Sequence, residues 1–258
     1  MRDAAYETQV LDVRRETHAR VGEALARHGA EPALVAQHLD VGGEAERAAA
    51  LYVDAAQREQ RRGAHPEATR LLSRAIDLLD GLPPSDDRDL RELTARMLRG
   101  LSVSSRQGYA SPAVQADQRR AEDLATGLGP RPEVLPSLIA IWSFWLIGGH
   151  GATARGLIEQ LTGMLRSDAF AWFAPEVAAC AGWQEFFAGN LLSARDHLER
   201  AAAGFESRPP EQRVSPFWPL PNDPVAVSSI ALACIAGLRG EAAESARQEQ
   251  EPSIVQKT

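Results

Sequence analysis

The chain has 258 residues, of which 44% are hydrophobic and 24% charged, with a formal net charge of -7. This balance excludes a disordered or collagen-like chain, and the acidic charge argues against nucleic acid as the main partner. The longest apolar run, 138–147, has about half of the ~20 residues that a membrane helix needs, and no signal-peptide pattern opens the chain, so we expect a cytoplasmic protein without a membrane partner.

Helix-forming residues dominate the sequence, since alanine is abundant and β-branched runs are almost absent. Prolines stand where first helical residues are expected, at Pro66, Pro112, Pro132 and Pro175. Glycines stand where helices should stop, at Gly63, Gly81, Gly127 and Gly189. The spacing predicts helices, in chain order, over residues 5–28, 32–40, 44–62, 66–80, 86–106, 112–127, 132–147, 151–166, 174–188, 191–206 and 224–237, with a short one near 240–250.

One skeleton of small and apolar residues recurs along the chain. In two clear copies, Gly63 is followed by Ala68 and Leu72, and Gly189 by Ala194 and Leu198, with small residues on the helix before each glycine. Further copies, two of them weaker, are centred on three more glycines: Gly149, Gly108 and Gly237. Small residues let two helices cross closely and glycine opens the turn between them, so each copy predicts a helical hairpin that must stack on its neighbours.

The pattern resembles the tetratricopeptide repeat (TPR) from residue 44 to 250, although successive copies are spaced more widely than the ideal period of about 34 residues. Longer helices and loops would absorb the difference and make the superhelix less regular. The resemblance implies an all-α fold, a right-handed TPR-like superhelical solenoid of about five helical hairpins.

Several segments are similar to a more specific family. Residues 3–28, 32–39 and 107–112, with Asn222-Asp-Pro, resemble the end of the ATPase module and the C-terminal repeat arm of bacterial STAND-type signalling ATPases, which often carry an adenylate/guanylate cyclase domain or a LuxR-type DNA-binding domain. The family's nucleotide-binding loop and magnesium-binding acid have no counterpart in this chain. The resemblance therefore implies the arm alone, truncated or separately encoded, with linker helices over 1–43, a TPR-like domain over 44–250 and a disordered tail over 251–258.

Patterns that could support catalysis are weak. Lysine occurs only at Lys257, which removes P-loop, Schiff-base and Ser–Lys chemistry, and the six histidines are scattered without a metal-ligand spacing. The G-x-G-x-x-A match at 149–154 aligns with a repeat turn, and the Ser, Asp and His within 193–197 share one helical turn, which does not make a triad. We expect Cys180 and Cys234 to be buried apolar side chains. The sequence predicts no catalytic residue, metal site or cofactor.

The inner wall of the superhelix is the predicted binding surface, because first-helix residues between the packing positions point toward it. Arginines beside an aromatic platform suit an acidic or extended peptide, although the aromatic residues could equally be core between repeats. The predicted concave-face residues are Gln57, Arg61, Arg99, Arg106, Trp183 and Phe187. A second contact is predicted for the proline-rich stretch 207–224, through Phe217 and Trp218.

The sequence thus predicts a non-catalytic module for protein or ligand recognition in bacterial signal transduction or transcription regulation. Its partner would be a protein or peptide, or a separately encoded ATPase or cyclase regulator. Two alternatives stay open: a small-molecule effector sensor that uses the same concave groove, and a non-functional gene remnant.

Overall fold

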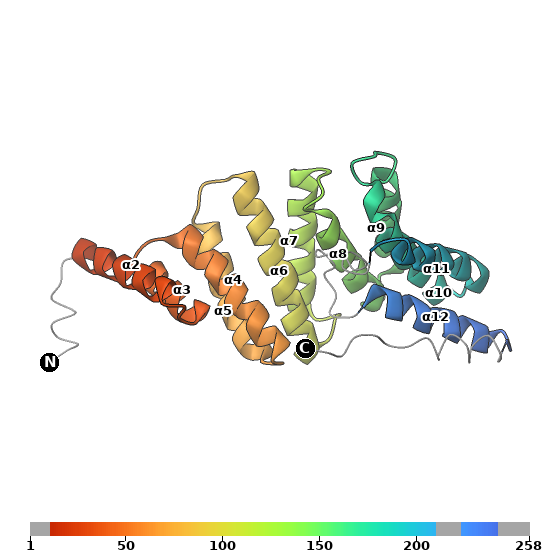
Figure 1. The fold of residues 1–258 in the computed structure, drawn as a ribbon, viewed down its shortest axis with the longest axis horizontal. Coiled ribbons are helices and arrows are strands. Elements are labelled where there is room, and N and C mark those ends of the chain that lie inside the picture. Colours follow the sequence, from red (N-terminus) through yellow and green to blue (C-terminus); the bar gives the residue numbers. More distant parts are fainter. Residues whose placement is uncertain (1–10, 210–222, 242–258) are drawn as a thin grey trace. The chain divides into compact units, whose positions relative to one another are not determined.

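A computed structural model of the chain describes residues 11–209 and 223–241. Every regular element within these residues is a helix, and none is a strand (Figure 1). The elements are α2 (Leu11–Arg27), α3 (Pro32–Val41), α4 (Ala45–Arg61), α5 (His65–Asp80), α6 (Asp86–Gln107), α7 (Pro112–Leu128), α8 (Leu135–Ile147), α9 (Gly151–Met164), a 3-10 helix (Ala171–Phe173), α10 (Ala174–Phe187), α11 (Leu191–Glu206) and α12 (Pro224–Leu238).

The predicted all-α fold is confirmed, and the predicted helix ends agree with the structure to within a helical turn wherever they fall on described residues. One start differs because Pro136, and not Pro132, takes the first-turn position of α8. The 3-10 helix before α10 has no counterpart in the predicted elements. Most of the helix predicted near 240–250 lies outside the described residues. No described helix combines the length and apolar character that crossing a membrane requires.

The chain divides into two compact units, Met1–Gly129 and Pro130–Thr258. In unit 1, each helix from α2 to α7 packs on the next one along the chain, and α4 also contacts α6. One hydrophobic core joins α3, α4 and α5, and includes Leu39, Ala56 and Leu72, all almost fully buried. The segment expected to be a linker therefore shares a core with the first predicted repeat. The predicted tail over 251–258 lies outside the described residues.

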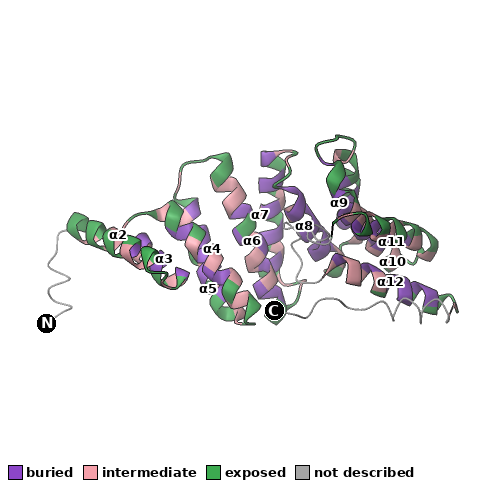
Figure 2. Ribbon diagram, viewed as in Figure 1, coloured by how far each residue is buried: buried purple, intermediate pink, exposed green. Residues whose placement is uncertain are grey.

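Unit 2 holds α8 to α12, and its helices also pack in chain order. In addition, α10 contacts both α8 and α12, so the first helices of successive hairpins lie next to each other. Residues of α8 are buried along most of the helix, whereas the last residues of α8, α10 and α12 are exposed (Figure 2). The helices of unit 2 thus pack as successive hairpins.

Left-handed glycines close most of the turns that follow helices. After α4, the amide of Gly63 donates to the carbonyl of Gln60 at 3.0 Å, and the amide of Ala64 donates to the carbonyl of Glu59 at 2.9 Å. These two bonds form a Schellman motif, which needs a positive φ, and Gly63 has φ 74°. The same pair of bonds follows α2, α8, α10 and α12, whereas Gly108 after α6 has a positive φ with a different bonding pattern.

Three glycines predicted to stop or turn the chain act differently. Gly127 and Gly237 lie inside the last turns of α7 and α12, and the positive φ belongs to Gly129 and Gly240. Gly81 ends α5 in a right-handed conformation. A helix tolerates glycine in its last turn at a cost of about 1 kcal/mol or less, so the second glycine of each pair can take the left-handed position.

Gly182 shows how closely the two helices of a hairpin approach. A Cβ atom at this position would lie 2.5 Å from Cγ of Leu198 and 3.2 Å from the carbonyl oxygen of Ala194. α10 and α11 therefore cross at this glycine, as the recurring skeleton predicts. In both clear copies the skeleton residues of the second helix are fully buried: Ala68, Leu72, Ala75, Ala194, Leu198 and Ala201.

We expect Gly182→Ala to destabilise unit 2 by about 1–3 kcal/mol, because the added methyl group must push Leu198 away from its packed position. The matched control is Gly156→Ala on α9, where no atom lies within 4 Å of the added methyl group. Alanine is the better helix former, so this variant should gain about 0.5–1 kcal/mol. Urea unfolding followed by circular dichroism measures both. A Gly182→Ala chain as stable as the control would contradict the close crossing.

Candidate functional site

The last turn of each first helix carries an exposed residue two positions before the turn glycine. We call these residues the end row. In unit 1 the end row contains side chains of one chemical type, at Arg27, Arg61 and Arg106. In unit 2 it contains side chains of a second type, at Ile147, Phe187 and Leu238, which are 56%, 62% and 68% exposed. Thus the same register position is basic in one unit and apolar in the other.

A hydrogen-bonded contact places two members of the unit 1 end row on neighbouring helix ends. The side-chain amide of Gln60 on α4 donates to the carbonyl of Leu98 at 2.7 Å and to the hydroxyl of Ser102 at 2.8 Å, both on α6. Arg61 follows Gln60 directly, and Arg106 lies one turn after Ser102 on the same helix face. Both predicted arginines are exposed.

Gln57 and Arg99 occupy other environments. Gln57 is half-buried, one turn before Arg61 on α4. The guanidinium of Arg99 binds Asp117 of α7, with an Nε–Oδ2 distance of 2.9 Å, and contacts the hydroxyl of Ser73 on α5 at 3.3 Å. Arg99 therefore points between the neighbouring helices α5 and α7. Arg99 stands nine residues before Gly108, and the buried Cys180 on α10 likewise stands nine residues before Gly189.

Arg99 belongs to a buried ion network between α6 and α7. Glu92 is fully buried and accepts hydrogen bonds from Arg96 at 2.6 Å and from Arg120 at 2.9 and 3.0 Å. Arg88 approaches the same carboxylate at 3.3 Å. Burial alone would raise the pKa of Glu92, but the hydrogen bonds from Arg120 and Arg96 outweigh it and hold the pKa below its ordinary value. The network joins two helices and leaves Arg99 no role on the exposed surface.

In unit 2, three aromatic rings gather at the end of α10. Trp183 stacks on Phe187 with ring centroids 5.6 Å apart, and Phe186 meets both rings edge-on. Trp183 and Phe186 are half-buried against a core that includes Leu198 of α11 and Ile235 of α12. The aromatic pair expected from the sequence is therefore divided: Trp183 is largely a packing residue, and Phe187 is the exposed edge of the cluster.

The sequence reasoning missed Arg27, Ile147 and Leu238 of the end row. Each of the three stands two positions before its turn glycine in the sequence, as Arg61 and Phe187 do, and this separation could have identified them. The expectation of two buried cysteines is half right. Cys180 is buried, which raises the pKa of its thiol well above the ordinary value, but Cys234 is exposed. Cys234 lies one turn before Leu238, so it shares the outward face of α12.

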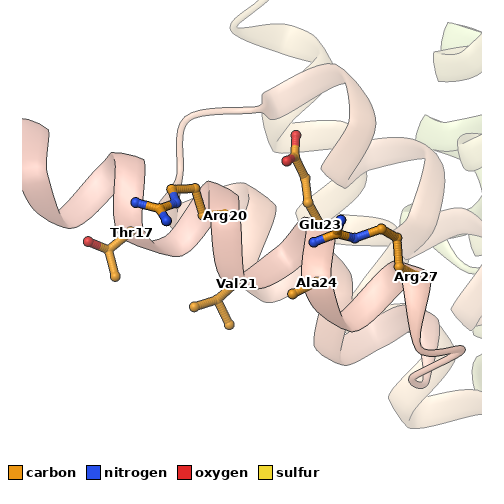
Figure 3. Close-up of a pocket in the computed structure, with 6 residues that line it drawn as sticks. All are labelled: Thr17, Arg20, Val21, Glu23, Ala24 and Arg27. Carbon is orange, nitrogen blue, oxygen red and sulfur yellow. The ribbon is translucent and has the colours of Figure 1, made fainter.

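A hollow of about 500 Å³ lies along α2 (Figure 3). Its described lining comes from this single helix, and a bound small molecule normally needs burial on most of its surface. We therefore assign it no ligand, and note only that Arg27 of the end row stands at one end. The lining residues are Thr17, Arg20, Val21, Glu23, Ala24 and Arg27.

The remaining sequence patterns have structural explanations. Gly149 closes a Schellman turn after a helix, so the G-x-G-x-x-A match does not follow a strand. His197 contacts the guanidinium of Arg200, which also pairs with Asp196 on the exposed side of α11. Within residues 11–209 and 223–241, no three His, Cys, Asp or Glu side chains are grouped as metal ligands. Phe217 and Trp218 lie outside the described residues.

Comparison with known proteins informs the fold alone. No family model matches the chain, and no curated protein matches it. Among solved structures, the crystal structure of BtubC (BKLC) from P. vanneervenii is similar, with a TM-score of 0.62 over 97% of this chain and 97% of that chain. The two sequences are 15% identical, so the likeness shows a shared helical fold and does not extend to binding or activity.

We expect Glu92→Gln to destabilise the chain by about 3 kcal/mol at pH 7, because the neutral amide leaves the partly buried Arg96 and Arg120 without their counter-charge. The folded-state pKa of Glu92 is lowered, so its contribution is complete above the ordinary carboxyl pKa and is lost as the pH falls through the lowered value. The difference between wild type and variant should therefore shrink below about pH 4.

Urea unfolding at pH 7 and at about pH 3 measures this difference. The control is Glu67→Gln on α5, an exposed carboxylate that pairs only with Arg70 among the described residues, for which we expect less than about 1 kcal/mol. Equal stability of Glu92→Gln and wild type at pH 7 would show that the network does not hold α6 and α7 together.

Proposed function

We propose that the chain is a non-catalytic recognition module that binds a protein or peptide partner through the apolar end row of unit 2. The observation that carries this proposal is the unit 2 end row, where a large apolar side chain stands exposed at the same position of three successive first helices. Single exposed apolar residues are common on protein surfaces and need no explanation. Three at one register position of stacked helices form a surface.

Packing within the fold does not account for these exposed side chains. Ile139 and Ile141, on the same helix as Ile147, are fully buried, so α8 already places isoleucine side chains in its core. Phe187 stacks on Trp183, which fixes the ring at low conformational cost, and rigid aromatic residues of this kind dominate binding energies at protein interfaces. Burial of each apolar side chain by a partner would contribute about 1.5–3 kcal/mol.

The stacking of first helices on first helices, seen in the contacts of α4 with α6 and of α10 with α8 and α12, supports a TPR-like superhelical arrangement as part of this proposal. The setting that we propose is bacterial signal transduction or transcription regulation, as a repeat arm of STAND type. That setting is supported by the resemblance of residues 3–28 and 107–112 to the arm of that family.

A random peptide library displayed on phage tests the proposal, with the full chain as bait. We expect enriched peptides with apolar side chains that bind the wild-type chain at micromolar affinity. Phe187→Ala should weaken their binding at least tenfold, or about 1.4 kcal/mol. Phe187 is 62% exposed, so its replacement should leave the fold intact, which circular dichroism checks.

The matched control is Leu34→Ala, which removes an apolar side chain that is 43% exposed on the second helix α3, outside the end row. Its affinity for the enriched peptides should equal that of the wild type. The proposal fails if no peptide is enriched, or if the enriched peptides bind Phe187→Ala and the wild type equally well.

A further inference from the structure

Among the described residues, the arginines of the unit 1 end row have no carboxylate partner, whereas neighbouring arginines do. Nearby arginines on α4 are engaged, since Arg47 pairs with Glu23 at 3.5 Å and Arg58 with Asp54 at 3.3 Å. Arg27, Arg61 and Arg106 are exposed, and no carboxylate of the described residues pairs with them. Within the described residues, these three guanidinium groups therefore carry no ion pair.

The helix dipole favours a cation in the last turn of a helix, by about 0.3–1 kcal/mol. This effect does not explain the row, because the equivalent position of unit 2 holds Ile147, Phe187 and Leu238 without any loss of the turn geometry. The fold therefore accepts either type of side chain there. The fold does not require arginine at this position of three helices, and binding of an anionic partner would explain it.

The spacing of the helices sets the spacing of the charges. Packed helices lie about 8–10 Å apart, and an extended peptide advances about 3.3 Å for each residue. One step from helix to helix therefore matches about three peptide residues. This match applies to α4 and α6, which contact each other and are joined by the hydrogen bond of Gln60 with Ser102.

We propose that unit 1 binds an extended acidic segment of a protein partner, with two carboxylates three residues apart facing Arg61 and Arg106. This inference rests on the proposed recognition function and names the partner chemistry of the unit 1 end row. Arginine suits the role because its planar guanidinium can accept a carboxylate in a two-point contact. Neutral residues between the acids would cross the spaces between helix ends.

A nucleic acid fits this surface less well. Its phosphates are closely and evenly spaced, whereas unit 1 also exposes carboxylates, with side chains 70% exposed at Glu31 and 58% at Glu46. Such groups would repel a continuous polyanion but would tolerate a peptide whose charges are separated. The formal net charge of the whole chain, -7, acts in the same direction.

Three peptides of equal length test the inference. The first carries glutamate at every third position with glycine and serine between, the second carries the same glutamates in one block, and in the third glutamine replaces each glutamate. Fluorescence anisotropy with the full chain, at low and at high salt, measures their affinities. We expect the spaced peptide to bind at least tenfold more tightly than the other two, with an affinity that falls as salt rises.

Arg61→Glu combined with Arg106→Glu should weaken binding of the spaced peptide at least tenfold. The matched control combines Arg70→Glu with Arg119→Glu, which makes the same change of charge at exposed positions of the second helices α5 and α7. It should leave the affinity within about twofold of wild type. Arg99 is unsuitable for this test, because its reversal would also break the pair with Asp117.

The outcomes separate this inference from the proposed function. Equal affinity for the block peptide, or tighter binding of a single-stranded oligonucleotide, would overturn the spaced carboxylate register. If the spaced peptide does not bind while library peptides bind through Phe187, the inference is wrong and the recognition function stands. If neither class of peptide binds, both are wrong.

Discussion

A left-handed glycine follows the first helix of each described hairpin, and the packing register on both sides of the turn depends on it. The Schellman bonds at Gly63 and Gly189 fix where one helix stops and the direction in which the next one starts. The next helix then presents a small residue, Ala68 or Ala194, to its hairpin partner. Because the turn is closed by backbone bonds, the residue two positions earlier has no part in closing it, and it is left facing outward.

The hairpins of the two units differ in how many charges they bury. In unit 2, α10 and α11 approach through Gly182 and small apolar residues, and one buried carboxylate, Glu176 on α10, pairs with Arg208 just after α11. In unit 1, α6 and α7 are joined by Glu92 and Asp117 with several arginines, so the contact also depends on charge. A buried ion network tolerates little change in its members, because a charge without its partner is costly to bury. This is the physical reason why not every first-helix arginine belongs to the surface.

Helix positions and hairpin crossings could be predicted from the sequence, because proline, glycine and alanine act locally through backbone conformation and size. The faces of individual side chains could not. Arg99 and Arg106 have the same chemistry and lie two turns apart, yet one is paired in the interior and the other is exposed, which depends on Asp117 from another helix. Trp183 and Phe187 likewise differ in burial, because α12 packs against Trp183 and not against Phe187.

The unequal exposure of the two cysteines gives the molecule a built-in attachment point. Burial keeps the thiol of Cys180 protonated and out of reach, so a thiol-specific reagent at neutral pH would meet only Cys234. A fluorophore or spin label attached there would sit one turn from Leu238 on α12, with no need to engineer a site. The native sequence therefore carries its own reporter beside the apolar part of the end row.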